Sequence, residues 1–138
     1  MPKSRLAIEG PRCLSLLVAK ELRLLEAGKA NLCGLFSVFH HDRFPCTKTF
    51  VAHATFAGIT GDALLTISFV GPDGSILLAR NHRLKDGRPN RLTTFACDDN
   101  WPCPESGEHR LLASIDGQIA GVFPMVIGPA EMVERLGY

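Results

Sequence analysis

Short apolar runs alternate with polar residues and turn residues along most of the 138-residue chain. Between residues 63 and 70, for example, Leu65, Ile67 and Phe69 are each separated by one polar residue. A period of two is typical of a strand that buries one of its faces. The 13 glycines and 9 prolines are spread along the whole length, and no long segment before residue 129 has a helical period. The pattern therefore predicts many short strands.

The apolar runs predict strands over 12–19, 21–25, 30–39, 49–57, 63–70, 75–79, 91–97, 109–115 and 119–127. Three of the breaks between them are turns that predict hairpins, at 26–29, at the Gly-Pro-Asp-Gly of 71–74 and at the Asp-Gly-Gln of 116–118. Two polar stretches, 80–91 and the proline-rich 98–108, are interpreted as loops. Pro124 lies inside the last run, which predicts a sheet edge or a bulge there.

About eight strands at hairpin spacing predict an all-β fold, a single-domain antiparallel β-sandwich of the immunoglobulin-like kind. Each sheet has one apolar face, so two sheets cover each other. A closed barrel is the alternative. The domain spans 1–138 with its core at 12–128, and 129–138 predicts one short helical tail. Pro129 suits the first helical position and Gly137 the stop.

The turns and core positions resemble those of a bacterial family of small β-sandwich domains of unknown function. The shared features are a Gly-Lys turn, a Gly-x-Phe strand end, a Phe-Pro loop and a Pro-Asp-Gly hairpin, carried here by "EAGKANLCGLFSVFHHDRFPC" and "ALLTISFVGPDGSIL". The ending "GEHRLLASIDGQIAGVFPMVI" is also similar, so the resemblance covers roughly 12–128. It implies the sandwich fold and brings no enzymatic activity, cofactor or catalytic residue.

Charge, hydropathy and cysteine content limit the partners and the cellular compartment that we expect. With 15 basic and 14 acidic side chains the net charge is +1, which provides no general attraction for nucleic acid or an anionic membrane. No apolar run reaches the roughly 18 residues that span a bilayer, and the first residues do not resemble a signal peptide. Five cysteines would leave one unpaired in a disulfide framework, so we expect free thiols in the cytoplasm.

Two segments hold side chains that ligate metals. "HHDRFPC" contains His40 and His41, and "CDDNWPC" contains Cys97 and Cys103. Adjacent residues of a strand point to opposite faces, so only one histidine could face a shared ion. The two cysteines are also spaced more widely than in a zinc knuckle. We therefore predict no metal site, keep these four residues as weak candidates, and interpret "HHDRFPC" as a polar loop that packs over the end of the sandwich.

Other catalytic chemistry has even less support. Cys46 with a neighbouring histidine could form a thiolate pair, but no helix is predicted to start at Cys46 and lower its pKa. The chain has no nucleophile-elbow serine motif and no glycine-rich nucleotide-binding motif. The sequence therefore predicts neither a catalytic residue nor a cofactor.

Two features predict surfaces that bind a partner. The first is the basic segment after residue 79, which contains Arg80, Arg83, Lys85 and Arg88 and could bind phosphate or an acidic partner surface. It lacks the interleaved aromatic rings of a nucleic-acid site, and it could instead be solvated or neutralise the acidic 98–108 stretch. The second is Trp101, either an exposed interface anchor or a plug for the end of the sandwich.

The leading interpretation is a non-enzymatic, cytoplasmic protein-interaction module. It would use loops and edge strands to bind a protein partner or a second copy of itself as a homodimer. One alternative is a sandwich that binds a small ligand or carbohydrate, although most aromatic residues lie at core-like positions. The other is a metal-dependent enzyme whose ligands would be His40, His41, Asp42, Cys97 and Cys103.

Overall fold

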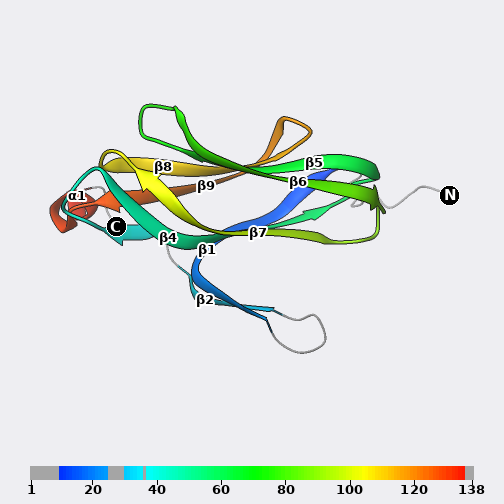
Figure 1. The fold of residues 1–138 in the computed structure, drawn as a ribbon, viewed down its shortest axis with the longest axis horizontal. Coiled ribbons are helices and arrows are strands. Elements are labelled where there is room, and N and C mark those ends of the chain that lie inside the picture. The colour runs from blue at the N-terminus through cyan, green and yellow to red at the C-terminus, as the bar shows by residue number, and fades with distance from the viewer. Residues whose placement is uncertain (1–9, 25–29, 36, 136–138) are drawn as a thin grey trace.

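A computed structural model of the protein describes residues 10–24, 30–35 and 37–135. Within these ranges the chain forms nine strands and one helix (Figure 1). The elements are β1 (Arg12–Leu24), β2 (Ala30–Leu35), β3 (Val38–His40), β4 (Cys46–Ala57), β5 (Gly61–Val70), β6 (Ile76–Gly87), β7 (Thr93–Cys103), β8 (Gly107–Ile115), β9 (Gln118–Gly128) and α1 (Ala130–Arg135).

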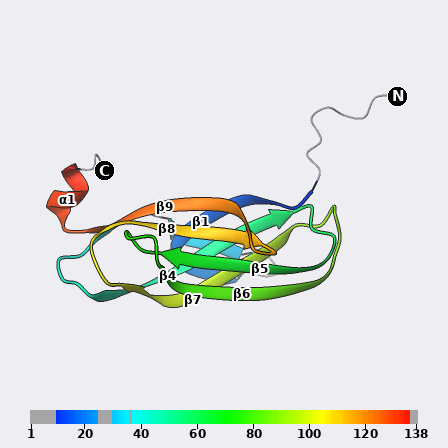
Figure 2. The same cartoon turned by 90° about the horizontal axis from the view of Figure 1, so that it is seen from above.

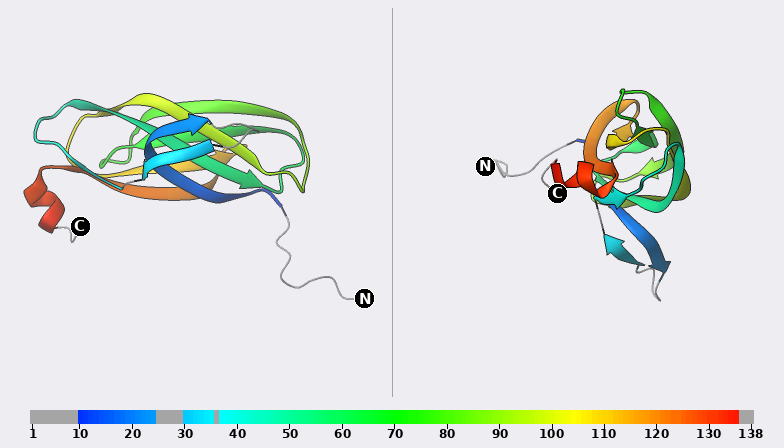
Figure 3. Two further views of the ribbon diagram at one scale, coloured as in Figure 1. Left: turned by 90° about the horizontal axis from the view of Figure 1, so that it is seen from below. Right: turned by 90° about the vertical axis from the view of Figure 1, so that its left-hand side faces the viewer.

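The strands form two sheets that pack face to face, which confirms the predicted β-sandwich (Figure 2). One sheet has the order β2-β1-β4-β7, and the other has the order β3-β9-β8-β5-β6. Every pairing is antiparallel except that of β3 with β9, which is parallel. The far end of β1 and all of β2 project from the body as an arm, and α1 lies at one end of the sandwich (Figure 3).

Alternation along the central strands builds the core between the sheets. In β8, His109, Leu111, Ala113 and Ile115 are buried, whereas the residues between them are more exposed. The largest buried side chains from the other strands are Trp101, Phe50, Phe56, Phe69, Leu65, Ile67, Met125 and Ile127. Burying such side chains stabilises the fold by about 1.5–3 kcal/mol each before the entropic cost of ordering the chain.

Two predicted boundaries near the N-terminus are wrong. The predicted strands 12–19 and 21–25 are one strand, β1, which pairs with β4 and then with β2. The predicted single run 30–39 is divided between two sheets, since β2 pairs with β1 and β3 pairs with β9. The hairpin that joins β1 and β2 is present, but its predicted turn at 26–29 lies outside the described residues.

Two predicted loops are largely strand. Residues 80–87 continue β6, because β5 is long enough to pair with it as far as Gly61 opposite Gly87. Residues 98–103 continue β7, because β4 begins at Cys46 and pairs along that whole stretch. Polar composition misled the prediction, since both strands lie at sheet edges, where polar side chains can face water.

The remaining turns follow the prediction. The Gly74 N–H donates to the carbonyl oxygen of Gly71 at 3.0 Å, which closes the turn between β5 and β6. Asp116 and Gly117 have φ angles of 50° and 82°, as in a two-residue hairpin turn of type I′. Pro124 precedes the part of β9 that pairs with β3, so β9 has an unpaired side there within the described chain.

The tail forms the predicted short helix, α1, which starts directly after Pro129. Val133 is buried, and the Val133 N–H donates to the carbonyl oxygen of Pro129 at 3.1 Å. Among the residues described, no helix has the length and apolarity that crossing a bilayer requires.

Candidate functional site

The basic segment predicted from the sequence lies on β6, which is an edge strand. β6 pairs with β5 on one side and ends its sheet on the other. Eight of its twelve residues are exposed, an unusual share for a strand in this protein. Leu78 and Leu84 are half-buried against the core and hold the strand in place. Arg83 and Lys85 are exposed and available to a partner.

Among the described residues, Arg80 is the one predicted interface residue on β6 that forms an ion pair. Its Nε donates to Oδ2 of Asp99 on β7 at 2.5 Å, which links the edges of the two sheets. The hydrogen bond with Arg80 lowers the pKa of Asp99, and the same bond raises the pKa of Arg80. The predicted neutralisation of the basic segment by the acidic one is therefore present at this pair. Arg80 mainly joins the sheets rather than offering free charge.

The other basic residues form no ion pair with the part of the chain that the structure describes. They lie near the loop from β6 to β7 and are Arg83, Lys85, Arg88 and Arg91. The Arg91 N–H donates to the carbonyl oxygen of Arg88 at 3.0 Å, so the loop is a closed turn. The nearby Asp62 carboxylate accepts the Asp86 N–H at 3.1 Å. Positive charge therefore remains unneutralised along this edge.

A hollow of about 390 Å³ lies beside these residues. It is lined by Leu84, Lys85, Asp86, Gly87, Arg91, Leu92, Thr93 and Thr94. Leu92 is 61% exposed, so an apolar side chain stands among the cations at its rim. The arrangement offers a partner an apolar contact together with positive charge.

Trp101 does not lie at an exposed loop tip. It is 0% exposed and belongs to β7, with its ring stacked on Phe50 at 4.8 Å between centroids. Its Nε1–H donates to the carbonyl oxygen of Phe50 at 2.9 Å, and Phe69 meets it edge-on. The interface interpretation of Trp101 is therefore corrected. The register with β4 turns this side chain inward, so the core interpretation holds.

The metal candidates are not gathered at one point. His40 is exposed at the end of β3, whereas His41 is partly buried with its Nδ1 3.0 Å from the Lys48 Nζ. Cys97 lies opposite Ala52, and Cys103 lies opposite Cys46 at the end of the same strand. Within the described ranges no three histidine, cysteine or acidic side chains converge as metal ligands would. His41 therefore contacts a cation of the chain itself.

Phe44 packs over the end of the sandwich, as predicted for the "HHDRFPC" segment. It packs against the core cluster and meets the His41 ring edge-on at 5.8 Å between centroids. Pro45, the next residue of the same segment, is exposed and follows a cis peptide bond. The Lys48 ammonium lies over Phe39 at 5.7 Å from the ring centroid, which adds a cation–π contact at this end of the sandwich.

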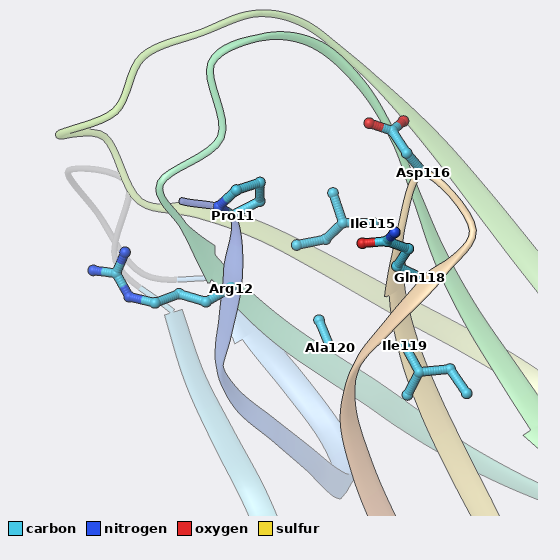
Figure 4. Close-up of a pocket in the computed structure, with 7 residues that line it drawn as sticks. All are labelled: Pro11, Arg12, Ile115, Asp116, Gln118, Ile119 and Ala120. Atoms are coloured by element: carbon cyan, nitrogen blue, oxygen red, sulfur yellow. The ribbon is translucent and has the colours of Figure 1, made fainter. Parts of the chain in front are cut away.

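A second hollow, of about 400 Å³, lies at the other end of the sandwich between the start of β1 and the β8–β9 hairpin (Figure 4). Its charged side chains do not converge, because Arg12 and Asp116 lie on different sides of it (Figure 4). Arg12 donates to the Gly10 carbonyl oxygen at 3.2 Å, and Asp116 accepts the Leu64 N–H at 2.8 Å. Both groups serve the local backbone, so the hollow gives a small-ligand site little support.

Two histidines that the sequence pattern did not single out lie partly or fully inside the sandwich, His53 half-buried and His109 buried. His109 is fully buried and stacks on Phe69 at 5.2 Å between centroids, with Nδ1 3.1 Å from the Gly107 carbonyl oxygen. Burial lowers the pKa of His109, and it also lowers the pKa of His53. Among the residues that the structure describes, His109 Nε2 and His53 Nδ1 have no hydrogen-bond partner. The period of two in "HRLLASI" places His109 on the apolar face, and that signal could have identified it.

The two-sheet topology defines the class, a β-sandwich, and one similar solved structure shares this fold. The crystal structure of the C-terminal domain of Wzt is similar, with a TM-score of 0.51 and 12% identity over 87% of this chain and 74% of that one. An immunoglobulin-like protein from Pseudomonas aeruginosa gives a TM-score of 0.44 and 15% identity over 85% of this chain and 95% of that one. No protein-family model and no curated protein matches the chain.

Proposed function

We propose that this domain is a non-enzymatic protein-interaction module of the cytoplasm that binds an acidic, extended segment of a partner along β6. The observation that carries the proposal is the edge position of β6 together with cations that have no partner in the described chain. An edge strand presents backbone N–H and C=O groups to which another strand can add.

The side chains around that edge support an acidic partner. Arg83 and Lys85 are two residues apart, so they lie on the same face of β6. Arg88 and Arg91 extend the positive charge into the following loop. An extended peptide with acidic residues at every second position would match this spacing, and charge complementarity would favour its approach.

The non-enzymatic part of the proposal is supported by the roles that the reactive side chains already have. Cys97 and Cys103 are buried in the core, where burial raises the pKa of the first to about 11 and of the second to about 12. Such thiols are poor nucleophiles at neutral pH. His109 is enclosed against Phe69, and Lys48 contacts His41.

A labelled peptide tests the proposal. The probe is a 12-residue peptide that alternates glutamate with valine, and fluorescence anisotropy measures its binding to the full chain. The double variant Arg83→Glu, Lys85→Glu should weaken binding about tenfold or more, since each surface charge pair contributes up to about 1 kcal/mol. Higher salt should weaken binding as well.

Arg110→Glu is the matched control, because Arg110 is an exposed cation of the same sheet but lies on β8, two strands from the edge. It should change binding less than twofold. A peptide that alternates lysine with valine should not bind. Equal binding of both peptides, or a double variant that binds like the wild type, would contradict the proposal. Light scattering of the free protein shows whether a second copy is the partner instead.

A further inference from the structure

Two cysteines that the sequence analysis treated separately face each other in the structure. Cys46 is the first residue of β4, Cys103 is the last residue of β7, and the antiparallel register pairs them directly. The two side chains interact, and this interaction contributes to the raised pKa of Cys103. The Cys103 Sγ also lies 3.6 Å from the carbonyl oxygen of Trp101, to which the thiol donates.

The two thiols differ in their exposure. Cys103 is fully buried, whereas Cys46 is partly exposed. A shallow hollow of about 280 Å³ lies beside the pair and is lined by Pro45, Cys46, Thr47, Pro102, Cys103 and Pro104. Cys46 is therefore the thiol that a small molecule at this end of the two strands reaches more readily.

The backbone geometry suits a bond between the two sulfur atoms. Directly opposed residues of antiparallel strands have Cα atoms about 4.5–5.5 Å apart. Native disulfides span Cα separations of about 4.4–6.8 Å, so no strand has to move. We propose that Cys46 and Cys103 form a modification site, at which a low-molecular-weight disulfide such as oxidised glutathione converts the two thiols into a cross-strand disulfide.

The reaction balances by two exchanges. Cys46 loses its proton, and its sulfur attacks one sulfur of oxidised glutathione, which forms a mixed disulfide and releases one glutathione thiolate. Cys103 then loses its proton and attacks the Cys46 sulfur, which releases the second glutathione thiolate. The protein gives up two protons and two electrons, and oxidised glutathione becomes two molecules of reduced glutathione. The two protons are taken up by the released thiolates.

The order of attack follows from the environment of each thiol. Burial is the largest cause that raises the pKa of Cys103 to about 12, and the neighbouring Cys46 contributes to the same shift. Cys103 therefore stays protonated until Cys46 has reacted, after which it needs only to reach a sulfur atom beside it. The other described core thiol, Cys97, lies opposite Ala52 rather than a second cysteine.

The bond would tie β4 to β7, the edge strand of its sheet. It would close a loop of more than fifty residues, since it joins positions 46 and 103. Closing a loop of that size restricts the unfolded chain, and oxidation should raise the melting temperature by roughly 10 °C. This site is independent of the β6 surface, because it lies at the opposite end of β7 from the β6–β7 loop.

The experiment treats the reduced full-length protein with oxidised glutathione at pH 8 and follows it by intact mass and by tryptic peptides. The expected product is 2 mass units lighter, with peptide 44–48 linked to peptide 92–110 through Cys103, as fragmentation shows. Its melting temperature should rise, and excess reduced dithiothreitol should reverse both changes. Cys97→Ala is the control and should form the same bond.

Three results would overturn the proposal. The first is a wild-type protein whose thiols stay reduced, and the second is one that stops at the mixed disulfide. The third is a bond that joins other cysteines. In the Cys103→Ala variant, Cys46 should keep the glutathione adduct, because the resolving thiol is gone. If that variant does not fold, the mapping of the wild-type bond still decides the matter.

Discussion

At the scale of single residues, Trp101 has the clearest energetic role. Its ring lies between Phe50 and Phe69 and hydrogen-bonds to the backbone of β4. Trp101→Ala should therefore cost about 3–5 kcal/mol of unfolding free energy, as removal of large core rings does. Trp101→Phe should cost less, about 1–3 kcal/mol, because it keeps a ring but leaves the Phe50 carbonyl without its donor.

Urea denaturation of the two variants measures these costs. An alanine variant as stable as the wild type would contradict the core assignment of this side chain. The same result would restore Trp101 as an interface residue.

A second residue-scale prediction concerns pH. Burial lowers the pKa of His109 below its unfolded value of about 6.5, so the unfolded chain binds the proton more tightly. The stability contributed by neutral His109 is present above about pH 6.5 and is lost as the pH falls below it. The loss has a limiting slope of about 1.4 kcal/mol per pH unit.

The His109→Phe variant keeps a ring against Phe69 but cannot titrate. Compared with wild type, its unfolding free energy should fall less between pH 7 and pH 5, as denaturation at each pH would show. The variant keeps part of the pH dependence, because burial also lowers the pKa of His53. Identical pH profiles for variant and wild type would exclude His109 as a titrating group.

At the scale of elements, the connection from β4 to β5 depends on Gly58. Its φ is +75°, and a Cβ there would lie 2.0 Å from the Gly10 carbonyl oxygen. Gly58→Ala should therefore destabilise the fold by at least about 2 kcal/mol, through strain and a backbone clash.

Gly74→Ala is the matched comparison for Gly58→Ala. Gly74 also has a positive φ, +87°, but a Cβ there meets nothing within 4 Å. It should cost only about 1 kcal/mol, the strain term alone. Equal melting temperatures for the two alanine variants would show that the clash at Gly58 is relieved.

Some strands and turns could be predicted from the sequence, whereas the full lengths of others could not. The alternation in 63–70 and the Asp-Gly turn at 116–117 are local signals, and both elements formed where predicted. β6 and β7 were cut short because their polar ends carry no local strand signal. What extends them is pairing with β5 and β4, a long-range effect that residue patterns do not contain.

The candidate site was predictable only in part for the same reason. The basic cluster at 80–91 is a local feature of the sequence, and its cations are exposed as a binding surface requires. Its position on a sheet edge depends on sheet order, and so does the ion pair by which Asp99 neutralises Arg80. The facing of Cys46 and Cys103 depends on the register of two distant strands, so counting cysteines could not reveal it.

At the scale of the whole molecule, the two sheets bury one face each and expose their edge strands. The core lies between them, and β6 is an edge strand of one sheet. Its cations Arg83 and Lys85 form no ion pair with the described part of the chain. We infer that the sandwich serves as a rigid support that presents this edge to an acidic strand.

Amide hydrogen exchange, read by mass spectrometry with and without the glutamate–valine peptide, tests this claim most directly. Strand addition predicts slower exchange along 76–87 when the glutamate peptide is present. It also predicts no such slowing with the lysine peptide or in the Arg83→Glu, Lys85→Glu variant. Unchanged exchange along β6, or slowing confined to another edge such as β2, would contradict the account.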